Sequence, residues 1–308
     1  MVRAARRRSP DADLLLVVGH TNVDRTVRVA QLPEPDRTVR IESVSESLGG
    51  TAANLALSAS AWGVPTAVAS RVGADFPSAY LRTLSEGHVE TSGLVRVRSG
   101  RTPSCLIVDD GRGGQMTFID QGAMEDGEGW RLPEALLGRT RWLHLSTGDP
   151  GAILRALSDA RRRGIPVSAD PAQEVHYRWT PRDLGGLIDG SEILFGNESE
   201  IQAVCTALKV PGPARLVDRV PLIVMTRGAE GARAFSRAGR TEARLTARGR
   251  GRPATGAGDA FRGGFYAAWF AGQVLRDCLV AGHRSAARWM RGRGRPIRTR
   301  STPVGRAP

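Results

Sequence analysis

Short apolar runs alternate with longer helical patterns along most of this chain. Residues 14–18 form an uninterrupted apolar run, which is typical of a strand buried on both faces. Strands that alternate with helices predict βαβ units, whose strands are parallel. We therefore expect an α/β protein with a doubly wound, mostly parallel sheet. From residue 142 onward the alternation predicts strands over 142–145, 166–169, 192–196 and 222–226, and helices over 152–163 and 198–207.

The N-terminal part of the chain departs from this regular alternation. Residues 27–44 alternate loosely and are interrupted by Pro33 and Pro35, which favours short strands that stand off the main body. Residues 104–109 and 115–120 surround a glycine-rich turn and predict a β-hairpin. The other elements predicted here are a helix entered at 48–54 and ending near 62–63, a strand over 67–72 and a helix over 76–86.

Polar or glycine-containing turns follow five of the predicted strands. Parallel sheets bind ligands at the carboxyl ends of their strands. We therefore expect a composite site along that edge, as in any doubly wound enzyme. The residues concerned are Asp24, the turn over 147–150, Asp170, Asn197 and Arg227-Gly228.

The run Thr255-Gly256-Ala257-Gly258-Asp259 is the most specific motif of the chain. Glycines let backbone approach a ligand closely, and the first N–H groups of a helix hold phosphate well. A carboxylate beside them can accept the proton of an attacking hydroxyl. The structural alternative is a glycine-rich turn in which Asp259 is an ordinary first-turn residue, stabilised by the helix dipole.

Three further motifs each allow a ligand-binding and a structural interpretation. Asn197-Glu198-Ser199-Glu200 could hold Mg²⁺ through water or form a capping box at a helix start. The run from Thr226 to Gly231 could support a nucleotide over its glycines or be a simple β-turn. Gly49-Gly50 with Asn54 could bind hydroxyl groups or allow tight helix packing.

The common phosphate-binding motifs are missing from the sequence. There is no GxxxxGK[ST] motif, and Lys209, the only lysine, lies in an unrelated Ala-Leu-Lys-Val-Pro context. No GxGxxG follows a strand, which argues against a dinucleotide dehydrogenase. Phosphate handling must therefore depend on backbone amides, arginine and a metal.

The net charge of +13 would ordinarily suggest a nucleic-acid or anionic-membrane partner. Here arginines are scattered along the chain, and the dense clusters lie near its ends, at residues 6–8 and 291–300. We expect a disordered basic tail over 1–12, an Arg/Gly-rich segment over 291–308, and no specific nucleic-acid binding.

Further composition limits the class of protein. No apolar run approaches the roughly 20 residues that span a membrane, and residues 6–8 lack the hydrophobic segment of a signal peptide. Three cysteines, widely spaced and without a CxxC pair, predict a reduced chain with neither disulfides nor a zinc site. A cytoplasmic location is expected.

These motifs together resemble the ribokinase/pfkB carbohydrate kinase family in order and spacing, over about residues 14–290. Within it the chain is most similar to archaeal-type broad-specificity nucleoside kinases. The resemblance implies a ribokinase-like domain over 13–290, with a small β lid formed by segments 25–46 and 101–120. The stretches that carry the closer likeness are Gly19-His20-Thr21-x-x-Asp24, His144-x-x-Thr147-Gly148-Asp149-Pro150, Asp170-Pro171-x-Gln173 and Asp259-Ala260-Phe261-Arg262-x-Gly264-Phe265.

The resemblance also implies a reaction and roles for particular residues. ATP with Mg²⁺ would phosphorylate the 5′-hydroxyl of a nucleoside of the inosine, guanosine or cytidine type, with Asp259 as general base. Arg262 would be an extra phosphate or salt-bridge group, and two lids could pair in a homodimer. The remaining roles are the anion hole (Gly256, Ala257, Gly258), the ribose site (Asp24, Gly49, Gly50, Asn54), nucleobase contacts (Phe118, Gln121), the ATP side (Asn197, Thr226, Gly228, Gly231, Thr255) and the magnesium site (Glu200).

One departure and two alternatives accompany this interpretation. Pro253 stands where the family usually has an Asp of a monovalent-cation loop, which argues against potassium activation. Arg101 and Arg112 would suit a sugar or sugar-phosphate kinase acting on ribose, fructose or fructose 6-phosphate. The arginine-rich C-terminal segment would suit a non-catalytic polyanion-binding protein on a kinase fold.

Overall fold

The computed structural model describes residues 13–244, 255–292 and, as backbone only, 302–303. The predicted basic tail over 1–12, the Pro253 position and most of the segment over 291–308 lie outside the described residues. Among the residues described, no helix has both the length and the apolar character needed to span a bilayer.

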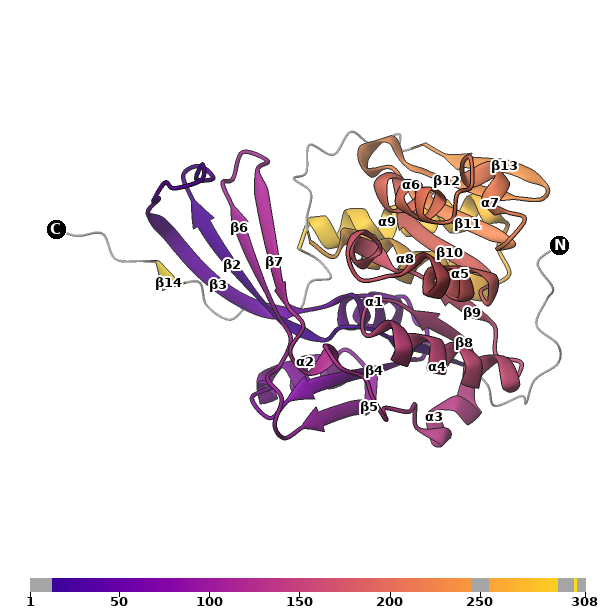
Figure 1. Cartoon of the computed structure of the whole chain (residues 1–308), viewed down its shortest axis with the longest axis horizontal. Coiled ribbons are helices and arrows are strands. Elements are labelled where there is room, and N and C mark those ends of the chain that lie inside the picture. The colour runs from indigo at the N-terminus through magenta and orange to yellow at the C-terminus, as the bar shows by residue number, and fades with distance from the viewer. Residues whose placement is uncertain (1–12, 245–254, 293–301, 304–308) are drawn as a thin grey trace.

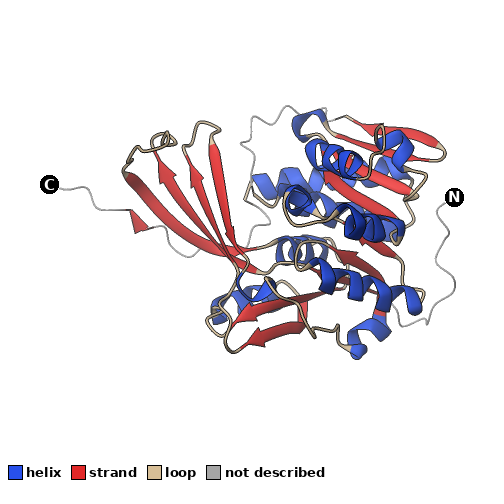
Figure 2. Ribbon diagram, in the orientation of Figure 1, coloured by secondary structure: helices blue, strands red, loops and turns tan. Residues whose placement is uncertain are grey.

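The main body is built around a sheet of nine strands, in the order β13-β12-β11-β10-β9-β8-β1-β4-β5. All pairings are parallel from β11 through to β5, and β12 and β13 add an antiparallel hairpin at one edge. The predicted doubly wound, mostly parallel sheet is confirmed (Figures 1 and 2). The strands are β1 (Leu14–Val18), β4 (Thr66–Gly73), β5 (Val89–Val97), β8 (Thr140–Leu145), β9 (Val167–Ala169), β10 (Ile193–Asn197), β11 (Leu222–Thr226), β12 (Ala232–Ser236) and β13 (Gly239–Ala243).

Helices cover both faces of this sheet and divide the core into two clusters. The apolar run of β1 serves both, since Leu14, Leu16 and Val18 face one cluster while Leu15 and Val17 face the other. One face carries α3 (Glu134–Arg139), α4 (Pro150–Arg162), α5 (Pro181–Asp189), α6 (Glu198–Ala207) and α7 (Pro213–Leu216). The other carries α1 (Thr51–Ser60), α2 (Ser78–Glu86), α8 (Ala257–Phe270) and α9 (Leu275–Met290).

A second sheet stands out from the main body, in the order β14-β3-β2-β6-β7 (Figure 1). The segments 25–46 and 101–120 lie in this sheet and its connections. Its root is close to the main sheet, because only three residues join β1 to β2 and β3 runs into α1 through Gly50. Its strands are β2 (Asn22–Val29), β3 (Ile41–Gly49), β6 (Ser104–Asp109), β7 (Gln115–Asp120) and β14 (Thr302–Pro303).

The turn predicted after β1 is shorter than expected. Residues 19–21 form it, and Asn22 already belongs to β2, so the expectation that Asp24 is a turn residue is wrong. Asp24 lies inside the strand because its backbone pairs with Ser47 of β3 on one side and Cys105 of β6 on the other. Three 3₁₀ helices complete the described elements: η1 (Gly122–Met124), η2 (Ala172–His176) and η3 (Gly228–Glu230).

Candidate functional site

The N-terminus of α8 is open toward the carboxyl edge of the sheet. Gly256 precedes the helix with a φ of 83°, in the left-handed region that favours glycine. A Cβ on Gly256 would lie 2.9 Å from Trp289 Cζ2 and 3.0 Å from Asn54 Nδ2, so a larger residue would not fit. No side chain of the described residues caps this helix end. Its first N–H groups lack an intrahelical acceptor, and such groups are suited to hold an anion.

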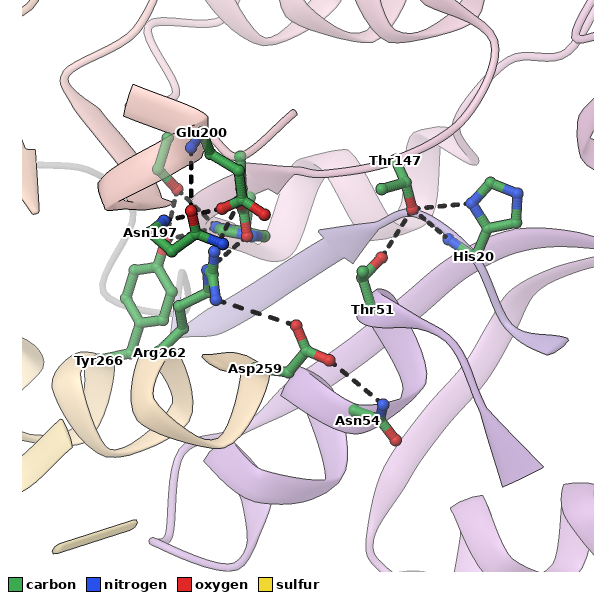
Figure 3. Close-up of polar contacts among 12 residues, drawn as sticks. His20, Thr51, Asn54, Thr147, Asn197, Glu200, Asp259, Arg262 and Tyr266 are labelled. Atoms are coloured by element: carbon green, nitrogen blue, oxygen red, sulfur yellow. Dashed lines mark hydrogen bonds and ion pairs between the residues drawn. The ribbon is translucent and has the colours of Figure 1, made fainter. Parts of the chain in front are cut away.

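Asp259 lies in the first turn of α8 and is buried, with 9% of its surface exposed. The Asn54 amide of α1 donates a 3.2 Å hydrogen bond to Asp259 Oδ2 (Figure 3). Burial raises the pKa of Asp259 to about 7, although the nearby Arg262 guanidinium opposes that shift. A carboxylate with such a pKa is suited to exchange a proton near neutral pH.

Arg262 lies one helical turn after Asp259 and is likewise buried. Its guanidinium forms an ion pair with Asp170, in which Nη2 donates a 2.7 Å bond to Oδ1 and Nε contacts Oδ2. Of the two roles predicted for Arg262, the salt bridge is present. Asp170 follows β9, so the pair joins α8 to the carboxyl edge of the sheet.

The residues predicted to bind ribose gather where β2, β3 and α1 meet. Asp24 is buried and accepts a 2.5 Å hydrogen bond from Asn22 Nδ2. Burial raises the pKa of Asp24 to about 7, and that hydrogen bond partly counteracts the shift. A Cβ on Gly49 would lie 2.1 Å from Asp24 Cγ, and one on Gly50, whose φ is +96°, would lie 2.2 Å from the His20 carbonyl oxygen. Both glycines therefore allow the backbone that leads into α1 to contact its neighbours closely.

Gln121 belongs to a buried polar cluster that the motif analysis did not assemble. His20 Nε2 lies 2.6 Å from Gln121 Oε1, and Gln121 Nε2 donates a 3.1 Å bond to Glu174 Oε1. The Gly148 amide donates to the other oxygen of Glu174 at 2.7 Å. Glu174 directly follows the Asp170-Pro171-x-Gln173 stretch, which is the one sequence signal that could have identified it.

Thr147 extends this cluster to α1. Its Oγ1 lies 2.7 Å from His20 Nδ1 and 2.8 Å from Thr51 Oγ1, as Figure 3 shows. Burial lowers the pKa of His20 to about 4, so the imidazole is neutral at physiological pH. Phe118, the other predicted nucleobase contact, lies on the edge strand β7 with 57% of its surface exposed. The side-chain hydrogen bonds of Gln121 go to His20, Glu174 and Tyr177.

Asn197 and Glu200 form the capping box that was the structural alternative for their motif. Asn197 Oδ1 accepts from the Glu200 amide at 2.9 Å, and Glu200 Oε2 accepts from the Asn197 amide at 2.7 Å. Gln173 Nε2 donates a 2.6 Å bond to Glu200 Oε1. Burial and the nearby Asp170 carboxylate raise the pKa of Glu200.

Glu200 is compatible with a water-mediated Mg²⁺ contact. A carboxylate offers about four acceptor sites, so two hydrogen bonds leave capacity for magnesium-bound water. Within the described part of the chain, no group of three or more His, Cys, Asp or Glu side chains is arranged to hold a metal. A metal bound here would therefore depend on water and on the phosphates of a nucleotide.

The remaining predicted ATP-side residues lie at the ends of β10 and β11 and just before α8. Thr226 pairs with Asn197 across these two strands, so the two motifs are neighbours. Gly228 has a φ of +53°, and Gly231 a φ of +103° with the Ala243 carbonyl oxygen 2.1 Å from any added Cβ. Thr255 accepts a 3.0 Å hydrogen bond from Trp289 Nε1 through its carbonyl oxygen. Beside the turn that carries the two glycines is a cavity of about 310 Å³, lined by Arg227, Ala229, Glu230, Ala232, Arg233, Glu242, Ala243 and Arg244.

Comparisons with known proteins agree with this arrangement. Residues 12–294 match the sequence pattern of the pfkB family carbohydrate kinases. A nucleoside kinase of Methanothermobacter thermautotrophicus is 32% identical over 272 residues, which cover 88% of this chain and 86% of that protein. An ATP-dependent ribose-1-phosphate kinase of Halopiger xanaduensis is 29% identical over 83% of this chain and 84% of its own length.

Solved structures support the same relationship. The crystal structure of the Methanocaldococcus jannaschii nucleoside kinase, an archaeal member of the ribokinase family, matches with a TM-score of 0.83 and 29% identity. The match covers 92% of this chain and 93% of that one. The predicted likeness to archaeal nucleoside kinases is confirmed. The chain belongs to the pfkB family of carbohydrate kinases and is a phosphotransferase whose acceptor is an alcohol.

Proposed function

We propose that the protein transfers the γ-phosphoryl group of ATP to the 5′-hydroxyl of a nucleoside of the inosine, guanosine or cytidine type. The observation that carries this proposal is the position of Asp259. The carboxylate lies beside the N-terminus of α8, which no described side chain caps, and Asn54 connects it to the helix that follows Gly49 and Gly50. The residues that we propose as base, anion site and hydroxyl-binding site are thus adjacent.

The proposed chemistry is an in-line displacement. The 5′-oxygen attacks the γ-phosphorus as its proton passes to Asp259, and ADP leaves with the electrons of the broken P–O bond. Asp24 and Asn54 would position the nucleoside through its ribose hydroxyls, and the amides of residues 256–258 would stabilise charge on the transferred group. Catalysis of phosphoryl transfer depends chiefly on such positioning and charge stabilisation.

The nucleotide would lie on the side of β10 and β11. Thr226, Gly228, Gly231 and Thr255 would line its phosphates, next to the arginine-containing cavity. Asn197 and Glu200 would hold Mg²⁺ through water. When bound, Mg²⁺ neutralises charge on the β- and γ-phosphates.

The alternative of a sugar-phosphate acceptor loses the feature that suggested it. Arg101 forms a 2.9 Å ion pair with Asp120 at one end of the β6–β7 hairpin, and Arg112 lies in the turn at the other end. Six residues of strand separate these ends, about 20 Å at ~3.3 Å per residue. The two arginines therefore do not converge on one phosphate.

A substrate panel tests the proposed reaction. ADP release is measured with ATP and Mg²⁺ for inosine, guanosine, cytidine, ribose, fructose and sugar phosphates, with and without K⁺. We expect turnover of at least one nucleoside and no requirement for K⁺. Activity confined to fructose 6-phosphate or another sugar phosphate would contradict the nucleoside assignment. Steep salt-dependent DNA binding without any kinase activity would favour the polyanion-binding alternative.

We also propose that two copies of the chain associate through the lid. A second proposal is that the protein works in the cytoplasm. Leu106, Met116, Phe118 and Ile119 expose apolar surface on β6 and the edge strand β7, and exposed apolar patches favour association. All three cysteines are free, which suits a reducing compartment. Analytical ultracentrifugation of the protein and of Met116→Lys tests the dimer. A wild-type monomer at all concentrations would contradict it.

A further inference from the structure

The Arg262–Asp170 ion pair occupies an unusual place beside Asp259. Arg262 is 5% exposed and Asp170 is 1% exposed, so both charges are withdrawn from water. Burying an ion pair is costly unless its geometry is good, and replacing such a pair with apolar residues is often neutral or stabilising. Fold stability alone therefore does not account well for this pair.

The Arg262 guanidinium lies beside Asp259 and Gly258. Arg262 Nη1 lies 4.0 Å from Asp259 Oδ1, close enough for electrostatic attraction but beyond hydrogen-bond distance. A Cβ on Gly258 would lie only 2.8 Å from the same Nη1. Gly258 thus leaves room for the guanidinium directly beside the backbone of the anion site.

Asp170 keeps Arg262 in this position from the other side. It takes up two nitrogens of the guanidinium, which restricts rotation of the planar group. His144 Nε2 lies 3.6 Å from Asp170, and His144 Nδ1 lies 2.8 Å from the Tyr266 hydroxyl. Burial lowers the pKa of His144, so this neighbour adds no charge at neutral pH.

We propose that Arg262, held by Asp170, is a positioning residue that fixes the Asp259 carboxylate and keeps it ionised as the base. This inference rests on the proposed function. The charged groups that influence Asp259 are Arg262 of α8, Asp170 after β9 and Glu200 of α6, while Asn54 of α1 is a neutral donor. Without Arg262, Asp259 would face two carboxylates and, within the part of the chain that the structure describes, no cation.

The ion pair with Asp170 also explains why Arg262 Nη1 stays 4.0 Å from Asp259 Oδ1. A direct Arg262–Asp259 salt bridge would stabilise the ionised carboxylate strongly and weaken it as a base. Asp170 binds the guanidinium instead, so Asp259 receives attraction while Oδ1 stays available for a proton. Arg262 and Asp170 are therefore predicted to act in opposite directions on the same carboxyl group.

The test is the ionisation of Asp259 in Arg262→Gln and Asp170→Asn. It is read by ¹³C NMR titration of the carboxyl carbon in the ligand-free protein and by the acidic limb of kcat against pH. In Arg262→Gln we expect the midpoint of Asp259 ionisation to rise by about one pH unit or more. Turnover at pH 7 should then fall about fivefold or more and recover above pH 9. In Asp170→Asn the freed guanidinium should turn to Asp259, and the midpoint should fall below that of the wild type.

Two further variants keep the test decisive. Arg262→Lys retains the positive charge, so the titration midpoint of Asp259 should stay near the wild-type value. This variant can be measured even if Arg262→Gln does not fold. Arg219→Gln removes a two-point ion pair with Asp189 and serves as the matched control, with no expected shift. Midpoints that stay unchanged, or that move in the same direction in Arg262→Gln and Asp170→Asn, would overturn the proposal. A wild-type protein inactive on the whole substrate panel would instead contradict the proposed function, while the NMR titration would still judge Arg262.

Discussion

Asn54 and Asp259 share a 3.2 Å hydrogen bond although 205 residues separate them in the chain. Asn54 lies in α1, which follows β3 of the second sheet, and Asp259 lies in the first turn of α8 on the same face of the main sheet. The two helices also contact each other where Ser58 Oγ donates a 3.2 Å bond to the Ala260 carbonyl oxygen. Asn54, which we propose to bind the acceptor, is thus hydrogen-bonded directly to the proposed base.

Replacing Asp259 tests how much the proposed base contributes to kcat. In Asp259→Asn we expect kcat to fall by about 10²–10⁴-fold, because an amide cannot accept the hydroxyl proton. The affinity for nucleoside, measured by calorimetry, should change little since the asparagine retains the shape of the side chain. Asp277→Asn, at an exposed first-turn position of α9, is the matched control and should have wild-type turnover. Near-wild-type kcat in Asp259→Asn would remove this residue from the base role.

The pH dependence of the wild-type enzyme follows from the same carboxylate. Burial raises the pKa of Asp259 to about 7, and only the deprotonated form can act as base. We therefore expect log kcat/KM to fall with decreasing pH, at about one unit per pH unit below pH 7. Initial rates between pH 5 and pH 9 at fixed ionic strength measure this limb. A flat profile down to pH 5 would show that the step under measurement does not require this group in its basic form.

Glu174 should make the stability of the protein depend on pH in a recognisable way. Burial raises the pKa of Glu174 from an ordinary 4.5 to about 7, although hydrogen bonds from Gly148 and Gln121 oppose the shift. Between these pH values the folded state retains a proton that the unfolded state has lost, so this residue's contribution to stability falls as pH rises. Glu174→Gln mimics the protonated form and should lack this dependence.

Urea unfolding at several pH values measures the difference. Relative to the wild type, the free energy of unfolding of Glu174→Gln should rise by about 3 kcal/mol between pH 4.5 and pH 8. Glu128→Gln, at an exposed position, should follow the wild type throughout. A constant difference between Glu174→Gln and the wild type would mean that Glu174 is ionised in the folded protein well below pH 7.

Gly49 offers a test of the ribose site by crowding. Since an added Cβ would lie 2.1 Å from Asp24 Cγ, Gly49→Ala must displace that carboxylate or the strand beneath it. We expect a loss of about 1–3 kcal/mol in unfolding free energy and a KM for nucleoside raised more than the KM for ATP. Gly138→Ala, in α3 with no atom within 4 Å of the added Cβ, should leave both constants unchanged. Equal changes in the two KM values would contradict a specific role of Asp24 at the nucleoside.

The elements that the sequence predicts best are those marked by a continuous run of apolar residues. The bounds of β1 and β11 follow from uninterrupted apolar runs that are buried on both faces. The pattern does not identify β5, an edge strand with several exposed or half-exposed positions, or the β12–β13 hairpin, which is only partly buried. It also does not identify α9, whose buried side is built partly from small and polar residues such as Gly282 and His283.

For the candidate site too, sequence predicts some residues and not others. Asp259 and its glycines form one contiguous motif, so their juxtaposition is visible in the sequence. The ion pair of Arg262 with Asp170 spans 92 residues, and the bond from Gln121 to Glu174 spans 53. Such contacts depend on which loops meet at the sheet edge. Because Asn197 and Glu200 satisfy a capping box by themselves, their motif alone also does not distinguish a structural role from a magnesium site.

Glu200→Gln separates these two roles, because glutamine can also complete a capping box but carries no charge. We expect the melting temperature to change little, while the Mg²⁺ concentration for half-maximal velocity rises about tenfold or more and EDTA abolishes turnover in both proteins. Glu198→Gln removes an exposed carboxylate from the same first turn of α6 and should keep the wild-type magnesium response. If Glu200→Gln lowers the melting temperature without altering the magnesium response, the carboxylate serves the helix alone. The metal would then be held through the nucleotide phosphates without this side chain.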